Sequence, residues 1–310
     1  MLQTNEPSPT PALRRPVIGF IGTGRVAQAL IRCLLALDWP LAGLAGRDLE
    51  RTRALATALG RPGLALEVAP LVERADLVLL TVPDDAIEAT AAAWPWRPGQ
   101  AVVHCSGASE LQVLSAAQRR GARAGGFHPL QIFSDPERAA GRLSGCSVAV
   151  EAADPALHED LRALAAALGL VAITLPPGMR ARYHAAAGLA ASGLISVLHE
   201  AAQLWASFGV DEAAMLRALL PLSRGALAAA EARGLAGAVA GPVARGDDGV
   251  IRHQRQELVT LAPGPLALYD ALAWRQLALL DGAGRLDAAT LQRLATALQA
   301  SPAPVQVAEG

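Results

Sequence analysis

Near the start of the chain, the stretch 19-GFIGTGRVAQAL-30 has the residue types and spacing of a nucleotide-binding turn. Gly22 and Gly24 are two residues apart, and Ala27 takes the third small position of the dinucleotide pattern. Gly22 permits a tight turn, Gly24 lets the backbone approach a pyrophosphate, and N–H groups at the start of the next helix bind phosphates. Because an apolar run, 17-VIGFI-21, precedes the loop and an amphipathic pattern follows it, we predict a dinucleotide site; a turn without a ligand is the alternative.

The residues after the second predicted strand indicate which dinucleotide binds. An NAD site usually has Asp or Glu here to hold the ribose 2′-hydroxyl, but this chain reads 43-GLAGRDLERTR-53. Arg47 stands at the strand end, and a guanidinium group can bind a 2′-phosphate through two hydrogen bonds. We therefore predict NADP(H) rather than NAD. Two alternatives stay open: Asp48 as the ribose acceptor, and Arg47 as a solvated surface charge.

Histidine is the residue type best suited to supply a proton here. The cofactor supplies the hydride, so the protein must orient the substrate and protonate the oxygen that gains charge. His104 and His128 follow predicted strands, at the carboxyl edge where open α/β sheets bind ligands. His184 lies on the first helix of the second domain, which is expected to close over the nicotinamide, and is our first choice as proton donor. For each of the three, a structural histidine is the alternative.

A loop rich in Gly and Pro, 241-GPVARGDDG-249, interrupts the helical second half. Loops that rigid helices hold in place often carry function. Arg245 could bind a substrate carboxylate with its planar guanidinium group. A structural salt bridge with Asp247 or Asp248 is the alternative.

Several common chemistries are absent from the sequence. All 27 basic residues are arginine, which excludes a lysine Schiff base, a P-loop lysine and a lysine general acid. The segment 104-HCSGA-108 lacks the leading glycine of a serine-hydrolase elbow, and 199-HEAAQ-203 misses the zinc pattern H-E-x-x-H. We expect no catalytic metal. Three isolated cysteines fit a reducing compartment.

The two halves of the chain differ in their predicted secondary structure, which indicates two domains. Strands alternating with helical patterns predict an α/β Rossmann domain with a mostly parallel, doubly wound sheet, followed after Pro176-Pro177-Gly178 by an all-α C-terminal domain. We place disordered tails at 1–15 and 301–310, the Rossmann domain at 16–175 and the helical domain at 176–300. The expected strands are 17–21, 41–45, 77–82, 101–105, 122–127, 146–150 and 170–174, with a weaker one at 64–68. The expected long helices are 179–208, 211–232, 248–261, 265–280 and 287–300, with Asp211 and Asp287 as N-caps.

Charge and hydropathy limit the partners. A formal charge of −1 offers no field to attract nucleic acid or an anionic membrane. The longest uncharged stretches are short for a membrane span, so we expect no transmembrane helix and a cytoplasmic location. The Ala- and Leu-rich helices offer more apolar surface than a small bundle needs. We therefore expect a small-molecule substrate, no nucleic acid, no membrane, and a homodimer through the helical domain.

Downstream of the glycine loop, five ordered motifs carry a family resemblance. They are 82-VPDDAI-87, 103-VHCSGA-108, 126-GFHPLQIF-133, 183-YHAAA-187 and 241-GPVARGD-247. In this order they resemble the bacterial proteins with a Rossmann-like domain and a DUF2520 domain. Those are predicted NADP-dependent oxidoreductases, distantly similar to the β-hydroxyacid dehydrogenase, pyrroline-5-carboxylate reductase and ketopantoate reductase group. The resemblance covers nearly the whole chain between the tails, and it implies an NADP(H)-dependent reaction on a small polar carbonyl or imine, with ketopantoate as the most concrete candidate.

The resemblance also implies site residues. The glycine loop of the family matches Gly22, Thr23, Gly24, Arg25 and Val26, and a second cofactor loop matches Val82, Pro83 and Asp84, followed by Asp85. Ser106-Gly107 matches the Ser-Gly that related dehydrogenases use to orient substrate near the nicotinamide.

Two departures from the family pattern concern the chemistry. Arg180 stands where members often carry lysine, and Ser192 stands where they often carry asparagine. The lysine-based proton donation of the distant dehydrogenases therefore does not transfer to this chain. A protein that binds NADP as a sensor or scaffold, without catalysis, is the alternative to an enzyme.

Overall fold

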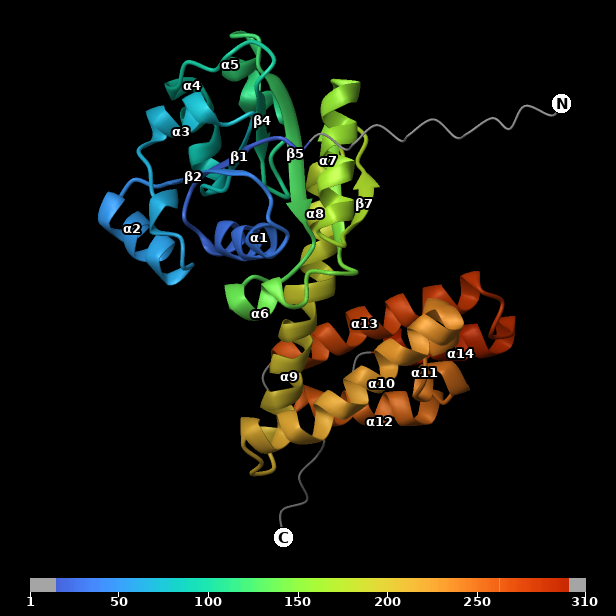
Figure 1. Ribbon diagram of the computed structural model, residues 1–310. Helices are drawn as coiled ribbons and strands as arrows, with labels where there is room; N and C mark the ends of the chain where they lie inside the picture. The colour runs from blue at the N-terminus through green and yellow to red at the C-terminus, as the bar shows by residue number, and fades with distance from the viewer. Residues whose placement is uncertain (1–14, 262, 301–310) are drawn as a thin grey trace, which may run out of the picture. The chain divides into compact units, whose positions relative to one another are not determined.

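The computed structural model describes residues 15–261 and 263–300, which form two compact units (Figure 1). The first unit ends at Gly188 and the second begins at Leu189. The predicted tails, 1–15 and 301–310, lie outside the described residues except for Arg15.

The first unit is built on one seven-stranded sheet with the order β2-β1-β3-β4-β5-β6-β7. All neighbours pair in parallel except β5 and β6, which are antiparallel. The strands are β1 (Ile18–Ile21), β2 (Leu41–Ala45), β3 (Leu77–Leu80), β4 (Ala101–His104), β5 (Arg123–Pro129), β6 (Ser147–Ala152) and β7 (Val171–Thr174). This confirms the predicted Rossmann-type α/β fold.

The weaker strand predicted at 64–68 is wrong. Residues Pro62–Leu64 form a 3₁₀ turn, and α3 (Val68–Arg74) begins soon after it. Between them, Ala65 makes a single parallel bridge to Leu44. The extended segment between these two elements is too short to form a ladder.

Helices cover the sheet, and the sheet divides the apolar core into two clusters, one on each face. The helices are α1 (Arg25–Ala36), α2 (Leu49–Ala58), α3, α4 (Ile87–Ala93), α5 (Ser115–Gln118), α6 (Pro136–Ala140), α7 (Pro155–Ala167) and α8 (Arg180–Gly188). Successive strand residues point to opposite faces. On β1 and β3, therefore, Phe20 and Leu79 belong to one cluster, whereas Ile21 and Leu80 belong to the other. A sheet covered on both faces is the arrangement that the continuous apolar strands predicted.

The second unit is all α-helical, as predicted. It contains α9 (Leu194–Ala206), preceded by a π-helical turn at Leu189–Gly193, and then α10 (Glu212–Ala238), α11 (Pro242–Arg245), α12 (Asp248–Val259), α13 (Pro263–Gly282) and α14 (Ala288–Gln299). Asp211 and Asp287 cap α10 and α14 by accepting hydrogen bonds from Ala214 N and Thr290 N, each at 2.7 Å. The expected loop 241–249 contains a one-turn helix, α11, because Pro242 is suited to a first helical position.

The division between the units falls later in the chain than the predicted boundary at 175/176. The first residue of α8, Arg180, is completely buried and bonds to residues of the first unit. The first turn of α8 is thereby tied to the sheet, and the whole helix groups with the Rossmann unit.

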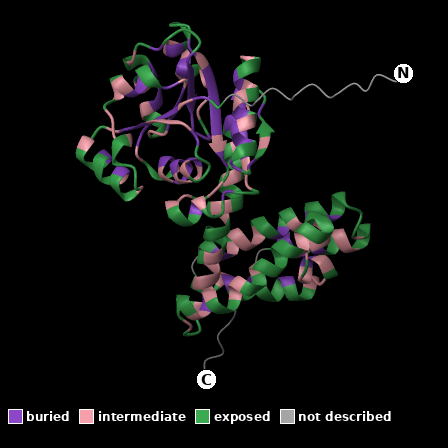
Figure 2. Ribbon diagram, in the orientation of Figure 1, coloured by how far each residue is buried: buried purple, intermediate pink, exposed green. Residues whose placement is uncertain are grey.

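Two helical runs, Arg180–Ala206 and Glu212–Ala238, are long and apolar enough to cross a membrane by length and composition alone. Core helices of soluble proteins pass the same test, so this is weak evidence for a membrane. Their side chains are nevertheless mostly exposed, as the green and pink ribbon of the C-terminal helices shows (Figure 2).

Candidate active site

The glycine loop joins β1 to α1 and leaves the start of the helix without a side-chain cap. Gly22 has a φ of 114°, and a Cβ there would lie 2.4 Å from the carbonyl oxygen of Thr81. Gly24 is the N-cap of α1, makes no side-chain cap bond, and no acidic residue occupies the first turn. A Cβ at Gly24 would lie 3.6 Å from Thr81 O, in ordinary van der Waals contact and without the clash that a Cβ at Gly22 would cause. Backbone N–H groups at a helix start that has no side-chain cap and no acidic residue in its first turn fit a pyrophosphate.

At the end of β2, the two candidate ribose-binding residues differ in what they contact. Asp48 is the N-cap of α2, and its carboxylate accepts a hydrogen bond from Arg51 N at 3.0 Å. Arg47 is exposed and makes no ion pair with any described residue. The residue before it, Gly46, packs on the glycine loop, since a Cβ there would lie 3.0 Å from Thr23 Cγ2. Arg47 thus stands beside the loop with its guanidinium group available.

The second predicted cofactor loop follows β3. Val82 is partly buried, whereas Pro83 and Asp84 are exposed, and a 3₁₀ turn spans Asp84–Ala86. The negative charge of Asp84 favours protonation of His128. This loop and β5 therefore face a common region at the carboxyl edge of the sheet.

The Ser106-Gly107 turn after β4 brings two histidines together. Ser106 is buried, and its hydroxyl oxygen accepts hydrogen bonds from Ala108 N at 3.1 Å and Ser109 N at 2.9 Å. A Cβ on Gly107 would lie 2.6 Å from His184 Cδ2 and 2.9 Å from His128 Nε2. Only glycine fits between the two rings without displacing one of them.

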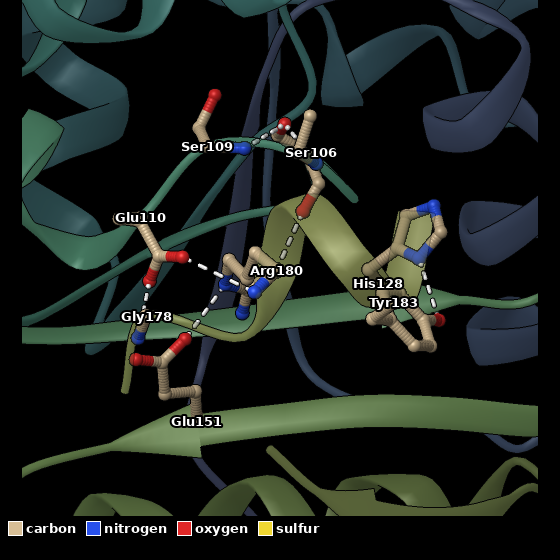
Figure 3. Close-up of polar contacts among 9 residues, drawn as sticks. Ser106, Ser109, Glu110, His128, Glu151, Gly178, Arg180 and Tyr183 are labelled. Carbon is tan, nitrogen blue, oxygen red and sulfur yellow. Dashed lines mark hydrogen bonds and ion pairs between the residues drawn. The ribbon is translucent and has the colours of Figure 1, made fainter. Parts of the chain in front are cut away.

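His128 contacts a residue that was not among the predicted site residues, Tyr183. The Tyr183 hydroxyl lies 2.9 Å from His128 Nδ1, and the two rings meet edge to face at 89° (Figure 3). Burial, and then the positive charges of His184 and Arg180, lower the pKa of His128 to about 4, while Asp84 opposes the shift. Burial raises the pKa of Tyr183, partly offset by Arg180. At neutral pH, His128 is therefore a neutral imidazole and Tyr183 a phenol.

Arg180 lies to one side of these rings and anchors the start of α8 (Figure 3). Its Nε donates to Glu151 at 2.6 Å and its Nη1 donates to the carbonyl oxygen of Ser106 at 2.8 Å. Glu110 accepts hydrogen bonds from the backbone N–H groups of Gly178 and Arg180, each at 3.1 Å. With no exposed surface, the guanidinium group is enclosed, so Arg180 does not present a charge to a ligand as an exposed lysine at this position could.

His104, the last residue of β4, is fully buried. Neither of its ring nitrogens has a hydrogen-bond partner in the described part of the chain, and the same holds for Arg180 Nη2. Burial and the nearby Arg180 lower the pKa of His104 to about 3, which keeps its ring neutral. A neutral histidine enclosed in this way is part of the packing below the site.

Arg245, the remaining predicted site residue, ends α11 in the second unit. Its side chain is exposed, and the salt bridge considered as an alternative is not formed within residues 15–261 and 263–300. Asp247 instead caps α12 through Val250 N at 3.1 Å, and Asp248 pairs with Arg252 at 2.6 Å. The role of Arg245 in binding a carboxylate stays a prediction.

Comparisons with known families agree with this architecture. Residues 17–107 match the family model described as NADP oxidoreductase coenzyme F420-dependent, and residues 146–276 match the domain of unknown function DUF2520. The two matches lie one after the other along the chain, the oxidoreductase model in the N-terminal half and the DUF2520 model further on. The N-terminal match supports a general oxidoreductase role and a nicotinamide cofactor.

Solved structures share the fold of this chain at low identity. A protein of Thermotoga maritima has a TM-score of 0.69 and 24% identity, covering 86% of this chain and 99% of its own. A protein of Bacteroides fragilis described as a candidate NADP oxidoreductase has a TM-score of 0.67 and 21% identity, with the same coverage of 86% and 99%. A reductive aminase of Aspergillus terreus, in complex with NADPH and ethyl levulinate, has a TM-score of 0.60 and 19% identity, covering 91% and 99%. No curated protein matches the chain.

Sequence reasoning missed three residues of this arrangement. A signal for Tyr183 was present, because it precedes His184 directly in the motif 183-YHAAA-187. Arg180 was noted only as a departure from the family pattern. Nothing in the sequence marked Glu151 as its partner, since the two are 29 residues apart and meet only through the pairing of β5 with β6.

Proposed function

We propose that this protein is an NADP(H)-dependent oxidoreductase that transfers hydride to or from a small polar carbonyl or imine compound, with ketopantoate the first candidate to test. One observation carries the proposal. Within a single compact unit, the uncapped start of α1 and the Nε2 of His128, which has no partner among the residues described, both lie at the carboxyl edge of the sheet, where ligands bind in this fold.

The residues present fit a nicotinamide dinucleotide. N–H groups of the loop Gly22, Thr23, Gly24, Arg25 and Val26 would hold the pyrophosphate, and Arg47 would hold a 2′-phosphate. Val82, Pro83 and Asp84 would border the cofactor between its adenosine and nicotinamide ends. The choice of NADP over NAD rests on Arg47 being available while the carboxylate of Asp48 caps α2. When bound, the cofactor supplies or accepts the hydride.

The protein's own side chains would orient the substrate and move the proton. Between the two predicted donors, geometry favours His128, because its Nδ1 is held by Tyr183 while its Nε2 has no partner among the described residues. His184 lies beside it, with ring centroids 6.1 Å apart, and would shape the same site. Ser106 would hold the turn that brings Gly107 against both rings, and Arg245 would bind a carboxylate of the substrate.

A titration with NADPH and NADH tests the cofactor assignment. Arg47→Ala removes a charge-assisted contact worth about 1.5–3 kcal/mol, so NADPH affinity should fall by roughly 10- to 150-fold while NADH affinity stays the same. Arg53→Ala, also exposed and close by on α2, is the matched control and should change neither affinity. If neither nucleotide binds the wild-type protein, the oxidoreductase proposal is wrong.

Oxidation of NADPH in the presence of candidate substrates, beginning with ketopantoate, then separates an enzyme from a sensor. In an enzyme, His128→Ala and His184→Ala should lose turnover and keep NADPH binding. A sensor or scaffold would bind NADPH and tolerate both changes without functional loss.

We also propose that the protein is a cytoplasmic homodimer joined through its helical unit. Large apolar side chains are exposed on the helical run Arg180–Ala206 and on α10, among them Leu189, Ile195, Leu222, Leu227 and Leu235. Exposed apolar surface, where it is contiguous, marks sites of protein–protein association. A second copy of the same chain offers the same surface and could cover it through a two-fold axis.

A further inference from the structure

The contact between Tyr183 and His128 has a consequence for how a proton would reach the substrate. This inference rests on the proposed function. We propose that Tyr183 is a positioning residue: its hydroxyl donates to Nδ1 of His128, holds the imidazole with its proton on Nε2, and replaces that proton at Nδ1 when Nε2 protonates the substrate.

The direction of the hydrogen bond follows from the protonation states of the two groups. His128 is neutral above a pKa of about 4, and the phenol of Tyr183 keeps its proton because burial raises its pKa. A phenol is a better donor than acceptor, whereas the unprotonated nitrogen of an imidazole is a good acceptor. The 2.9 Å contact is therefore an O–H donating to Nδ1, and the hydrogen bond at one ring nitrogen determines that the proton sits on the other.

The other ring nitrogen, Nε2, is the one that would hold the transferable proton. Nε2 lies close to the backbone of Gly107, where an added Cβ would be only 2.9 Å away, and it has no hydrogen-bond partner within the described residues. Tyr183 is held in place because α8 begins at Arg180, which is bonded to Glu151 and to Ser106 O. The donor nitrogen, the tyrosine and the turn after β4 thus form one rigid group.

The proton transfer balances only if both residues take part. Reduction of a carbonyl leaves negative charge on its oxygen. If neutral His128 alone gave up its Nε2 proton, it would become an imidazolate, which is far too basic to form at neutral pH. With Tyr183, the oxygen takes the proton from Nε2, Nδ1 takes the phenolic proton, and the charge ends on the tyrosine oxygen. The nearby charge of Arg180 stabilises this phenolate, and water can reprotonate the half-buried hydroxyl.

We call this transfer from Tyr183 through His128 to the substrate the relay. Few groups determine its pH dependence. Charged or titratable side chains act on His128 from three elements: Tyr183, His184 and Arg180 from α8, His104 from β4, and Asp84 from the turn after β3. Because the relay draws on a phenol rather than an imidazolium, the rate of reduction should not fall near pH 6.5. It should fall only as the pH rises through the elevated pKa of Tyr183.

The first test needs neither substrate nor cofactor. Nitrogen-15 NMR of histidine-labelled full-length protein at neutral pH, with His128 assigned through His128→Gln, reports which ring nitrogen carries the proton. We expect Nε2–H in the wild type, and a mixture of both tautomers in Tyr183→Phe. The matched control is Tyr269→Phe in the second unit, where the hydroxyl bonds to Gln254 at 2.7 Å, and it should leave the His128 signals unchanged. An Nδ1–H form in the wild type would overturn the inference, even if Tyr183→Phe failed to fold.

The second test is kinetic. Tyr183→Phe should lower kcat by about 10²-fold or more, the size typical of general acid catalysis, while KM and NADPH affinity stay near wild type. Unchanged kcat, or a wild-type rate that already falls above pH 6.5, would contradict the relay. The two proposals fail separately. Absence of nucleotide binding would end the proposed function and leave the tautomer standing, whereas the wrong tautomer would end the relay and leave the cofactor site standing.

Discussion

The two units of this protein bury their apolar residues to very different degrees. In the first unit, β1, β3 and β4 are buried along their whole length, and helices enclose both faces of the sheet. In the second, the buried core is a small cluster around Ile251, Leu280 and Leu294, while Leu222 and Leu235 on α10 are 69% and 71% exposed (Figure 2). The buried core of the first unit is therefore the larger one, and α10 of the second unit keeps exposed apolar side chains that a partner can cover.

Each unit contains a buried arginine whose hydrogen bonds join three segments of the chain. The two arginines differ in whether Nη2 of the guanidinium group has a partner. Arg255 bonds to both oxygens of Asp270 on α13 and to the carbonyl oxygens of Ala297 and Ala300 at the end of α14. Arg180 bonds to Glu151 and Ser106 O, but its Nη2 has no partner in the described chain. The arginine whose guanidinium group is incompletely paired therefore lies in the unit that holds the candidate site, and the more fully paired one lies in the helical unit.

Arg180→Met tests this difference with the largest expected effect. It leaves Glu151 buried and without its ion-pair partner, so the free energy of unfolding should fall by about 3–5 kcal/mol. Arg255→Met leaves Asp270 partly exposed to water and should lower it by less, roughly 1.5–3 kcal/mol. Denaturant unfolding of both variants measures the two values. Adding Glu151→Leu to Arg180→Met should restore much of the loss; equal losses in the two single variants would contradict the comparison.

Acid should weaken the first unit through its buried histidines. The folded pKa values of His104 and His128 are lowered to about 3 and about 4, below the ordinary 6.5 of an unfolded chain. Between pH 6.5 and about pH 3, the unfolded state therefore binds more protons than the folded state. The free energy of unfolding decreases as the pH falls through this range. His104→Leu removes one of these groups, so its unfolding free energy should depend less steeply on pH across that window. A slope identical to that of the wild type would mean that His104 is not held neutral.

Leu222→Asp should have the smallest effect on folding and a clear effect on assembly. An exposed substitution on α10 should change the unfolding free energy of the monomer by about 0.5 kcal/mol or less. If α10 lies in the proposed homodimer, sedimentation should show the variant dissociating at concentrations where the wild type is a dimer. Val171→Asp, 58% exposed on the edge strand β7, is the matched control and should leave the dimer intact. Dissociation by the control alone would place the interface at the sheet edge instead.

By itself, the sequence determined the elements and their order. Apolar runs alternating with helical patterns specified the sheet, the glycine spacing after β1 specified the turn into α1, and aspartates before apolar periods specified the caps of α10 and α14. These signals are local, because each depends on residues within a few positions of one another.

Only the tertiary structure decided which side chains meet. Tyr183 contacts His128, which is 55 positions away in the sequence, and Arg180 contacts Ser106, which is 74 positions away. The absence of a side chain at Gly107 matters only because His184 packs against it. Local periodicity carries no information on such contacts. They depend on the order of the strands, on the antiparallel pairing of β5 with β6, and on where α8 packs against the sheet. That docking made Arg180 an anchor and Tyr183 the partner of the candidate proton donor.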